Sequence, residues 1–475
     1  MRLIFIHGWS VLNTDTYGGL PAALTRHAAA AGLALDASHL HLGKYVSFAD
    51  DAKVDDLARG LQAALAAEVL PQLAQGERFA CITHSTGGPV VRAWIDLYHR
   101  LRPERCPLVH LIMLAPANHG SALAQLGKGR LSRMKFFLGG VEPGTGVLDW
   151  LELGSEQSWA LNTRWLALRL VKNGVYPFVL TGQRIDREFY DNLNTYTDEA
   201  GSDGVVRVAA ANLNFGQVRL VQGDGDRIEI AKDEHSERTV LGVLPGLSHS
   251  GTKIGIMGSV SPTDDGSHPT VKAVLRCLQV SSAAAYARAA TEFAALTAAT
   301  QERERRETVQ QLFLVKRTFE TDRYCMLVFR LSDDRGNELT DYDLLFTAGP
   351  AYDPNHLPPG FFVDRQRNQR RPGKLTYYLN YDRMVAGLQT PALADKFGFE
   401  IVARPTAGFA HYRRLSYRGT LSALKRFFEP NQTVMIDIQL RRWVDAGVVD
   451  LGTRLKPGDG VVRSPIARTP SGRTI

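Results

Sequence analysis

A single serine, Ser85, occupies the point where an apolar run gives way to a helical pattern in the stretch FACITHSTGGPVVRAW. Residues Phe79–Ile82 are typical of a short buried strand, whereas the apolar residues of Pro89–Tyr98 recur at helical spacing. Gly87 and Gly88 follow the serine and allow the helix to approach the strand closely. A hydroxyl raised on such a turn can be the nucleophile of an acyl transfer. The alternative is a structural serine that only caps the helix.

A nucleophilic serine needs a base that takes its proton and an acid that orients the base. Asp203 stands 118 residues after Ser85 in GSDGVVRVAAANL and is the candidate acid. An aspartate before a glycine is also common in turns for purely local reasons. Other carboxylates therefore stay open as the acid, all of them after the apolar segment 176–180: Asp186, Asp191 and Asp198.

Two histidines compete for the role of the base. His249 lies between small residues in VLPGLSHSGTK, 46 residues after Asp203. His268 lies in DDGSHPTVKAVL, directly before a proline and a helical pattern, which is typical of a helix entry. We therefore expect His249 to be the base, which gives the chain order serine, aspartate, histidine.

The negative charge that forms on the substrate oxygen needs backbone N–H donors. Thr86, the residue after the nucleophile, is one candidate donor. The other is Trp9 in FIHGWS, where His7 and Gly8 follow an apolar strand directly. The alternative is that Gly8 begins an ordinary turn and that Trp9 belongs to the core.

The elements that must hold these residues alternate along the first part of the chain. Residues 1–280 predict an α/β fold with a mostly parallel sheet and helices on both faces. Expected strands lie at 2–7, 40–46, 79–82, 109–114 and 176–180, with helices at 20–31, 54–73 and 89–98. Because the carboxyl ends of parallel strands meet at one edge, this fold can bring the three residues together.

The rest of the chain changes character after residue 280. Residues 281–308 are rich in alanine and end in alternating charges, which predicts an exposed connecting helix. Residues 309–475 contain apolar runs with a period of two, such as CMLVFRL, KLTYYLNY and TVMIDIQL, between turn residues. This pattern predicts an all-β sandwich as a C-terminal accessory domain.

Five motifs in order, IFIHGW, THSTGG, LAPANHGSALAQLG, SDGVV and GLSHSG, resemble the bacterial lipase and phospholipase branch of the α/β-hydrolases. The elbow of that superfamily is usually written G-x-S-x-G, and Thr83 departs from it. The resemblance covers residues 1–280. It implies a serine hydrolase that cleaves lipid esters through an acyl-enzyme, as a lipase or phospholipase A, with Ser85, Asp203 and His249 as the triad. It also implies Trp9 and Thr86 as the oxyanion donors.

Other functions stay open for such a chain. A thioesterase or an amidase would use the same triad. A non-catalytic module that binds lipid or a partner on a hydrolase scaffold is the alternative of a different class, although such a scaffold has no need of all three residues.

A glycine-punctuated, amphipathic segment at about 127–165 predicts a lid over an acyl-binding groove. We expect its large apolar residues Phe136, Phe137 and Trp150 to contact the substrate, together with His84 beside the nucleophile. The alternative is a structural excursion that packs on the sheet.

Composition and motifs narrow the partners further. The chain has 475 residues, 44% of them hydrophobic, and no apolar run approaches the 18 residues of a membrane span. The four cysteines are scattered and predict buried free thiols. No cofactor and no nucleic acid is expected, and no metal, although Asp264 and Asp265 suggest a calcium site as an alternative. The start MRLIFIHGWS lacks the features of a signal peptide, so we expect synthesis in the cytoplasm without a leader.

The positive charge is concentrated in the C-terminal part. Residues 1–300 carry 28 Lys+Arg and 29 Asp+Glu, whereas residues 301–475 carry 28 and 20, so their net charges are −1 and +8. Basic residues cluster at 365–371 and 413–418 beside aromatic residues, which predicts peripheral contact with an anionic membrane. This layout also resembles phospholipase effectors that are exported by a leaderless secretion route.

Overall fold

The computed structural model describes residues 1–6, 17–40, 51–125, 144–185, 199–224, 227–311, 315–404, 410–425 and 427–444. Within these ranges no helix is both long and apolar enough to cross a membrane. All four cysteines are free and buried, as the sequence predicts.

A six-stranded parallel sheet forms the centre of the first part, in the order β2-β1-β3-β4-β5-β8. Its strands are β1 (Arg2–Ile6), β2 (Asp36–Leu40), β3 (Phe79–His84), β4 (Leu108–Leu114), β5 (Tyr176–Thr181) and β8 (Val240–Val243). The inner strands are buried on both faces, whereas four of the five residues of the edge strand β2 are exposed. That polarity explains why the sequence placed the second strand too late, at 40–46.

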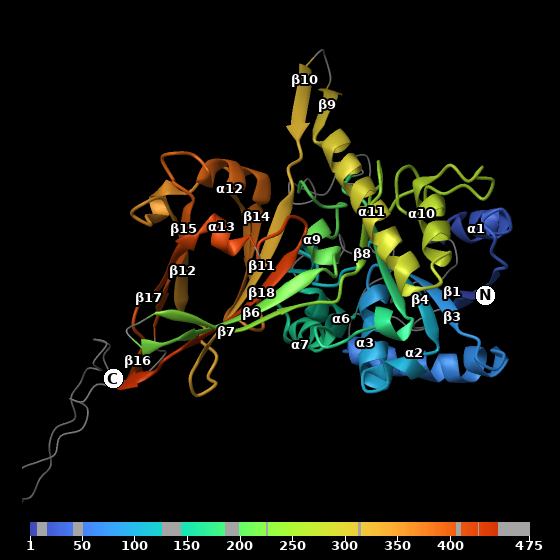
Figure 1. The fold of residues 1–475 in the computed structure, drawn as a ribbon, viewed down its shortest axis with the longest axis horizontal. Coiled ribbons are helices and arrows are strands. Elements are labelled where there is room, and N and C mark those ends of the chain that lie inside the picture. Colours follow the sequence, from blue (N-terminus) through green and yellow to red (C-terminus); the bar gives the residue numbers. More distant parts are fainter. Residues whose placement is uncertain are drawn as a thin grey trace, which may run out of the picture.

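Helices cover both faces of this sheet and form one hydrophobic core on each face. Successive side chains of a strand point alternately into these two cores. Leu3 and Phe5 of β1 point into one core, and Ile4 and Ile6 into the other. The helices of the first core are α1 (Leu20–Ala28), α10 (Pro269–Leu278) and α11 (Ala283–Glu304). Those of the second are α2 (Val54–Ala64), α3 (Gly87–His99), α6 (Thr145–Leu151), α7 (Glu156–Trp165) and α9 (Val208–Ala211). This is the predicted α/β-hydrolase architecture (Figure 1).

The expectation that 281–308 forms an exposed connecting helix is wrong in one respect. Helix α11 buries Tyr286, Phe293 and six smaller side chains, and two of the eight bond to the sheet through their hydroxyl groups. The Tyr286 hydroxyl accepts the Val240 amide at 3.0 Å, and the Thr297 hydroxyl accepts the Val243 amide at 3.0 Å. Because alanine is small and almost neutral in hydropathy, its presence does not reveal which face of the helix is covered.

Two antiparallel or mixed sheets make the predicted β-sandwich. The larger has the order β13-β14-β11-β18-β6-β7, and the smaller has the order β12-β15-β17. Their strands are β6 (Phe215–Gln222), β7 (Ile228–His235), β11 (Tyr324–Asp333), β12 (Tyr342–Ala348), β13 (Phe362–Arg367), β14 (Lys374–Asn380), β15 (Lys396–Ala403), β17 (Leu415–Thr420) and β18 (Thr433–Leu440). Side chains from both sheets share one core, so the fold expected for this part is confirmed.

The sandwich includes two strands, β6 and β7, that precede residue 280 in the chain. The hairpin β6–β7 leaves the hydrolase layers and extends the larger sheet, where β6 lies parallel to β18 (Figure 1). The hairpin β9 (Arg306–Gln311) and β10 (Val315–Glu320) forms a separate two-stranded unit after α11. Short elements complete the second part: α12 (Tyr381–Leu388), α13 (Leu421–Leu424), β16 (Ala410–His411) and β19 (Trp443–Val444).

Strand β11 contributes side chains to the cores of both parts. Its residues Cys325, Leu327 and Phe329 face the inside of the sandwich, whereas Tyr324, Met326 and Val328 belong to the core that contains α3, α7 and α9. The larger sheet is therefore covered on both faces, by its partner sheet and by the hydrolase helices.

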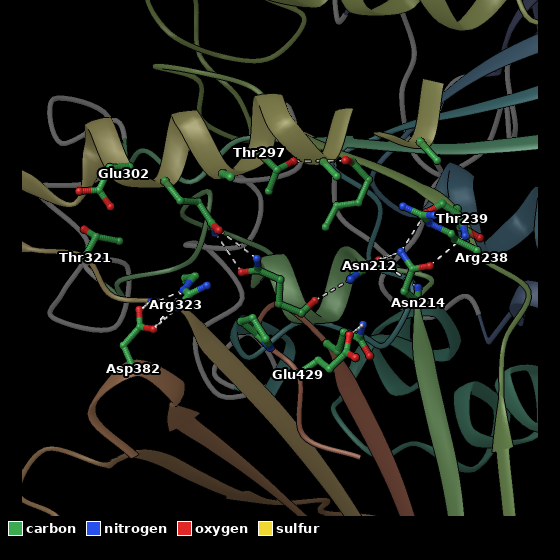
Figure 2. A pocket seen from close by; sticks show the side chains of 18 of the residues that line it. Asn212, Asn214, Arg238, Thr239, Thr297, Glu302, Thr321, Arg323, Asp382 and Glu429 are labelled. Carbon is green, nitrogen blue, oxygen red and sulfur yellow. Dashed lines mark hydrogen bonds and ion pairs between the residues drawn. The ribbon is translucent and has the colours of Figure 1, made fainter. Parts of the chain in front are cut away.

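A polar cleft of about 920 Å³ lies beside this junction, between α11 and the loop before β18. Figure 2 shows Thr297 and Glu302 of α11 on one side of it and the ion pair of Arg323 with Asp382 on the other. The residues that line the cleft do not include Ser85, Asp203 or His249.

Candidate active site

Ser85 occupies a strained turn between β3 and α3. Its φ of +52° lies in the left-handed region, which is costly for a residue with a Cβ atom. The Ser85 amide is fixed by the Leu114 carbonyl at 3.0 Å. The turn is tight because a Cβ atom on Gly88 would lie 2.9 Å from the Cβ atom of Pro116. These are the features of a nucleophile elbow, and Thr83 is completely buried near the end of β3.

The structure brings Ser85, Asp203 and His249 together from three distant loops. His249 Nε2 lies 3.2 Å from the Ser85 hydroxyl, and Nδ1 lies 3.0 Å from Asp203 Oδ2. With Nδ1–H donating to the carboxylate, the lone pair of Nε2 is free to accept the serine proton. The side chains of the histidine and the aspartate are completely buried.

The Asp203 carboxylate is oriented by the backbone of its own loop. The amides of Val205 and Val206 donate to Oδ1 at 3.0 and 2.7 Å, which leaves Oδ2 for the histidine. The His249 amide also donates to the Asp203 carbonyl at 2.9 Å. The loops of the acid and the base are therefore bonded both through side chains and through the backbone.

The rival histidine has a structural role. His268 is the N-cap of α10, where its Nδ1 accepts the Thr270 amide at 3.1 Å, and Nε2 contacts the Ser259 hydroxyl at 3.0 Å. Burial lowers the pKa of His268. The rival acids Asp186, Asp191 and Asp198 lie outside the described residues.

His84 contacts the candidate base, His249. This half-buried residue places its ring centroid 4.7 Å from that of His249, and its Nε2–H donates to the His249 carbonyl at 3.2 Å. These contacts support the loop of the candidate base, and the substrate contact expected of His84 stays a prediction.

Thr86 follows the serine and is the N-cap residue of α3. Within the described part of the chain its amide donates to no protein acceptor. The N-terminus of a helix carries a partial positive charge, so an oxygen anion is favoured there. Trp9, the other predicted donor, lies outside the described residues.

Two solved structures are similar to this chain over nearly its whole length. No family model matches the chain, and no curated protein matches it either. A solved structure titled phospholipase PlaB from Legionella pneumophila in complex with thio-NAD is 48% identical, with all of both chains covered and a TM-score of 0.90. A second PlaB structure is 50% identical over 97% of each chain, also at 0.90. The chain belongs to the PlaB phospholipase family. The predicted lipase and phospholipase branch and the predicted hydrolase class are confirmed.

The structure describes only the second half of the segment 127–165, for which the sequence predicts a lid. Phe136 and Phe137 lie outside the described residues, but the second half of the segment forms α6 and α7. Trp150 on α6 is only 2% exposed and packs in the core with residues of α2, α3 and α7. It is therefore a core residue, because α6 packs against neighbouring helices such as α2 and α7.

The two carboxylates suggested as a calcium site accept hydrogen bonds from backbone amides of their own turns. Asp264 accepts the Gly266 amide at 2.8 Å, and Asp265 accepts the Ser267 amide at 2.9 Å. Among the residues that the structure describes, no group of three or more His, Cys, Asp or Glu side chains could hold a metal ion.

Sequence reasoning missed a buried polar network behind the elbow of this PlaB-type hydrolase. Arg92 of α3 donates to Asn118 Oδ1 at 3.2 Å and to Asn162 Oδ1 at 2.7 Å, and its guanidinium lies over the ring of Trp165. Burial lowers the pKa of Arg92 to about 9, although Asp96 raises it. Burial and Arg92 lower the pKa of His119 in the same network to about 3. The signal was an arginine within an apolar helix pattern.

Proposed function

We propose that the chain is a phospholipase A, which releases a fatty acid from a glycerophospholipid by an acyl-enzyme route. The observation that carries this proposal is the hydrogen-bonded series Ser85, His249 and Asp203, with distances of 3.2 and 3.0 Å. The identity of about half of the residues to a phospholipase supports a phospholipid as the substrate.

In the first half of the reaction, His249 Nε2 accepts the hydroxyl proton of Ser85 while Oγ bonds to the ester carbonyl carbon. Asp203 stabilises the imidazolium that forms, and it keeps Nδ1 protonated. The Thr86 amide donates to the oxygen anion, a contribution of roughly 3 kcal/mol for one such donor. The bond from carbon to the glycerol oxygen then breaks, and that oxygen takes the proton from Nε2.

In the second half, a water molecule takes the place of the lysophospholipid, which has left as the alcohol. His249 accepts a proton from the water, whose oxygen bonds to the acyl carbon of the ester on Ser85. The bond from carbon to Oγ breaks, the serine regains its proton, and a free fatty acid leaves.

The test compares substrates with the purified chain. We expect fatty-acid release from phosphatidylglycerol and phosphatidylethanolamine to exceed that from triacylglycerol and from an acyl-CoA thioester. Ser85→Ala should abolish the release, and a fluorophosphonate should add its mass to the peptide that contains Ser85 in the wild type only. Release from triacylglycerol or acyl-CoA alone would contradict the phospholipase assignment, whereas an active Ser85→Ala variant would contradict the nucleophile.

We also propose peripheral contact with an anionic membrane through the C-terminal part. The net charge of residues 301–475 supports it, as do Phe362 and Val363 of β13, which are 45% and 41% exposed. Many of the clustered arginines are engaged within the protein, because Arg370 pairs with Asp149 and Arg371 with Glu338. The contact is therefore expected at the exposed β13 edge and not over the whole basic cluster.

Co-sedimentation of the full chain with vesicles tests this contact. Binding should rise with the fraction of phosphatidylglycerol, fall as salt is raised, and weaken in Phe362→Ser. If neither added salt nor Phe362→Ser weakened binding to the vesicles, β13 would be excluded as the contact surface.

A further inference from the structure

The loop that carries Asp203 is clamped to the sandwich by one buried arginine. We propose that Arg207 is a positioning residue, which holds the catalytic acid in place through an ion-pair bridge to Asp364 of the C-terminal sheet. The inference rests on the proposed function, since it concerns the acid of that same site.

Arg207 connects carboxylates from both parts of the molecule. Its side chain is 2% exposed, and its guanidinium donates to the two carboxylate oxygens of Glu199 at 2.8 and 2.6 Å. The same guanidinium pairs with Asp364 of β13 and lies 4.2 Å from the ring centroid of Tyr378 on β14. The planar guanidinium can hold both acids at once, which an ammonium group cannot reproduce.

Arg207 and Asp203 belong to one tight turn. Ser202 and Arg207 pair as an isolated bridge, and the Asp203 amide donates to the Val206 carbonyl at 3.2 Å. The amides of Val205 and Val206 lie between the two residues, and they are the donors that orient the Asp203 carboxylate. A shift of Arg207 is therefore transmitted to the carboxylate through only a few covalent bonds.

The sandwich supports the start of the same turn. The Tyr378 hydroxyl lies 3.1 Å from the Ala200 carbonyl and 3.2 Å from that of Gly201. A Cβ atom on Gly201 would lie only 2.3 Å from the ring of Tyr324, which stacks on Tyr378. The turn is thus pressed against two strands of the C-terminal sheet.

The end of the turn is held by the same sheet. The Thr433 hydroxyl donates to the Ala209 carbonyl at 2.8 Å, and Asn212 donates to the Asn431 carbonyl at 2.7 Å. Arg207 thus lies between two further attachment points, so the acid loop is bonded to the sandwich both before and after Asp203.

The decisive variants are Arg207→Lys and Asp364→Asn, with Asp437→Asn as the matched control. Asp437 is also a carboxylate of the larger sheet in a two-point pair with an arginine, Arg330, at 2.9 and 3.1 Å. Among the described residues, this control pair shows no hydrogen bond or ion pair with residues 199–212. It therefore reports what the loss of a comparable ion pair does to stability alone.

We expect both decisive variants to lower kcat roughly tenfold on a soluble short-chain ester with KM unchanged, because a misplacement near 1 Å can cost up to about 100-fold. Asp437→Asn should keep the wild-type kcat at a similar change in Tm. If Arg207→Lys does not fold, Asp364→Asn decides the matter, since it keeps the pair of Arg207 with Glu199.

Combination with Asp203→Asn separates positioning from a general structural effect. If Arg207 acts through the acid, Asp364→Asn should cost nothing further in the Asp203→Asn background. Additive losses, or an equal loss of kcat in Asp437→Asn, would overturn the inference. An active Ser85→Ala variant would instead refute the proposed function, so the two failures can be told apart.

Discussion

At the scale of single residues, the order of serine, aspartate and histidine together with their local neighbours points to the three side chains that the structure brings together, although order alone also admits His268 and three other aspartates. Their loops share small neighbours and follow apolar strands, and both features can be read locally. Arg207 could not be selected in this way, because its partner Asp364 stands 157 positions later. The role of an arginine near a catalytic acid cannot be inferred from the sequence, because the fold decides which carboxylate it pairs with.

The role of Asp203 gives the first prediction. Asp203→Asn should lower kcat on a soluble ester by about three to four orders of magnitude, because the amide favours the wrong imidazole tautomer. Circular dichroism should show an unchanged fold. His268→Ala is the control and should keep the wild-type rate, since that residue only caps α10. A wild-type rate in Asp203→Asn would transfer the role of the acid to another carboxylate.

The backbone of Ser85 gives the second prediction. Both Ser85→Gly and Ser85→Ala should be inactive, but the glycine variant should be more stable by about 1 kcal/mol, because only glycine adopts a positive φ without strain. The free energies of unfolding from urea titrations of the two variants measure the difference. Equal stabilities would mean that the elbow relaxes once the hydroxyl is removed.

At the scale of elements, amphipathic patterns predicted the existence of most helices and strands of the hydrolase part, but not always what they cover. The alanine-rich α11 was expected to be exposed, and instead it closes one face of the sheet over β8. Segment 144–165 was expected to cover a groove, and instead it forms α6 and α7 in the core. In both cases the pattern fixed the local structure, whereas the covered face depended on contacts far away in the sequence.

The buried face of α11 can be tested directly. Phe293→Ala should lower the free energy of unfolding by about 3–5 kcal/mol, since it leaves a cavity in the core that Phe293 shares with β8 and α10. Thr291→Ala on the exposed face of the same helix should change it by less than about 0.5 kcal/mol. Thermal and urea unfolding of both variants give the comparison. If both substitutions had a similar, small effect on the free energy of unfolding, α11 would be an exposed connecting helix, as the sequence predicts.

At the scale of the whole molecule, the sequence does not reveal which strands pair with one another. The period of two predicts strands in 309–475 but does not reveal that β6 and β7 join them, because register depends on partners that can lie anywhere in the chain. The two-sided packing of β11 was also not predictable from the sequence, because it depends on which elements lie on each face of the sheet. Residues of alternating faces in one strand, such as Met326 and Leu327, stabilise different parts of the protein.

The last prediction concerns a chain that ends at Arg305 and so keeps the whole candidate triad. Without β18 the strand β6 loses its parallel partner, and the side chains of α7 and α9 that pack on β11 become exposed to water. Asp203 also loses the support of Asp364 and Tyr378 on its loop. We therefore expect this truncated chain to aggregate or to hydrolyse short esters at less than a hundredth of the wild-type rate. Size-exclusion chromatography and labelling by a fluorophosphonate measure both outcomes. A soluble fragment that reacts with the label at the wild-type rate would show that the sandwich is an accessory unit and not a part of the catalytic core.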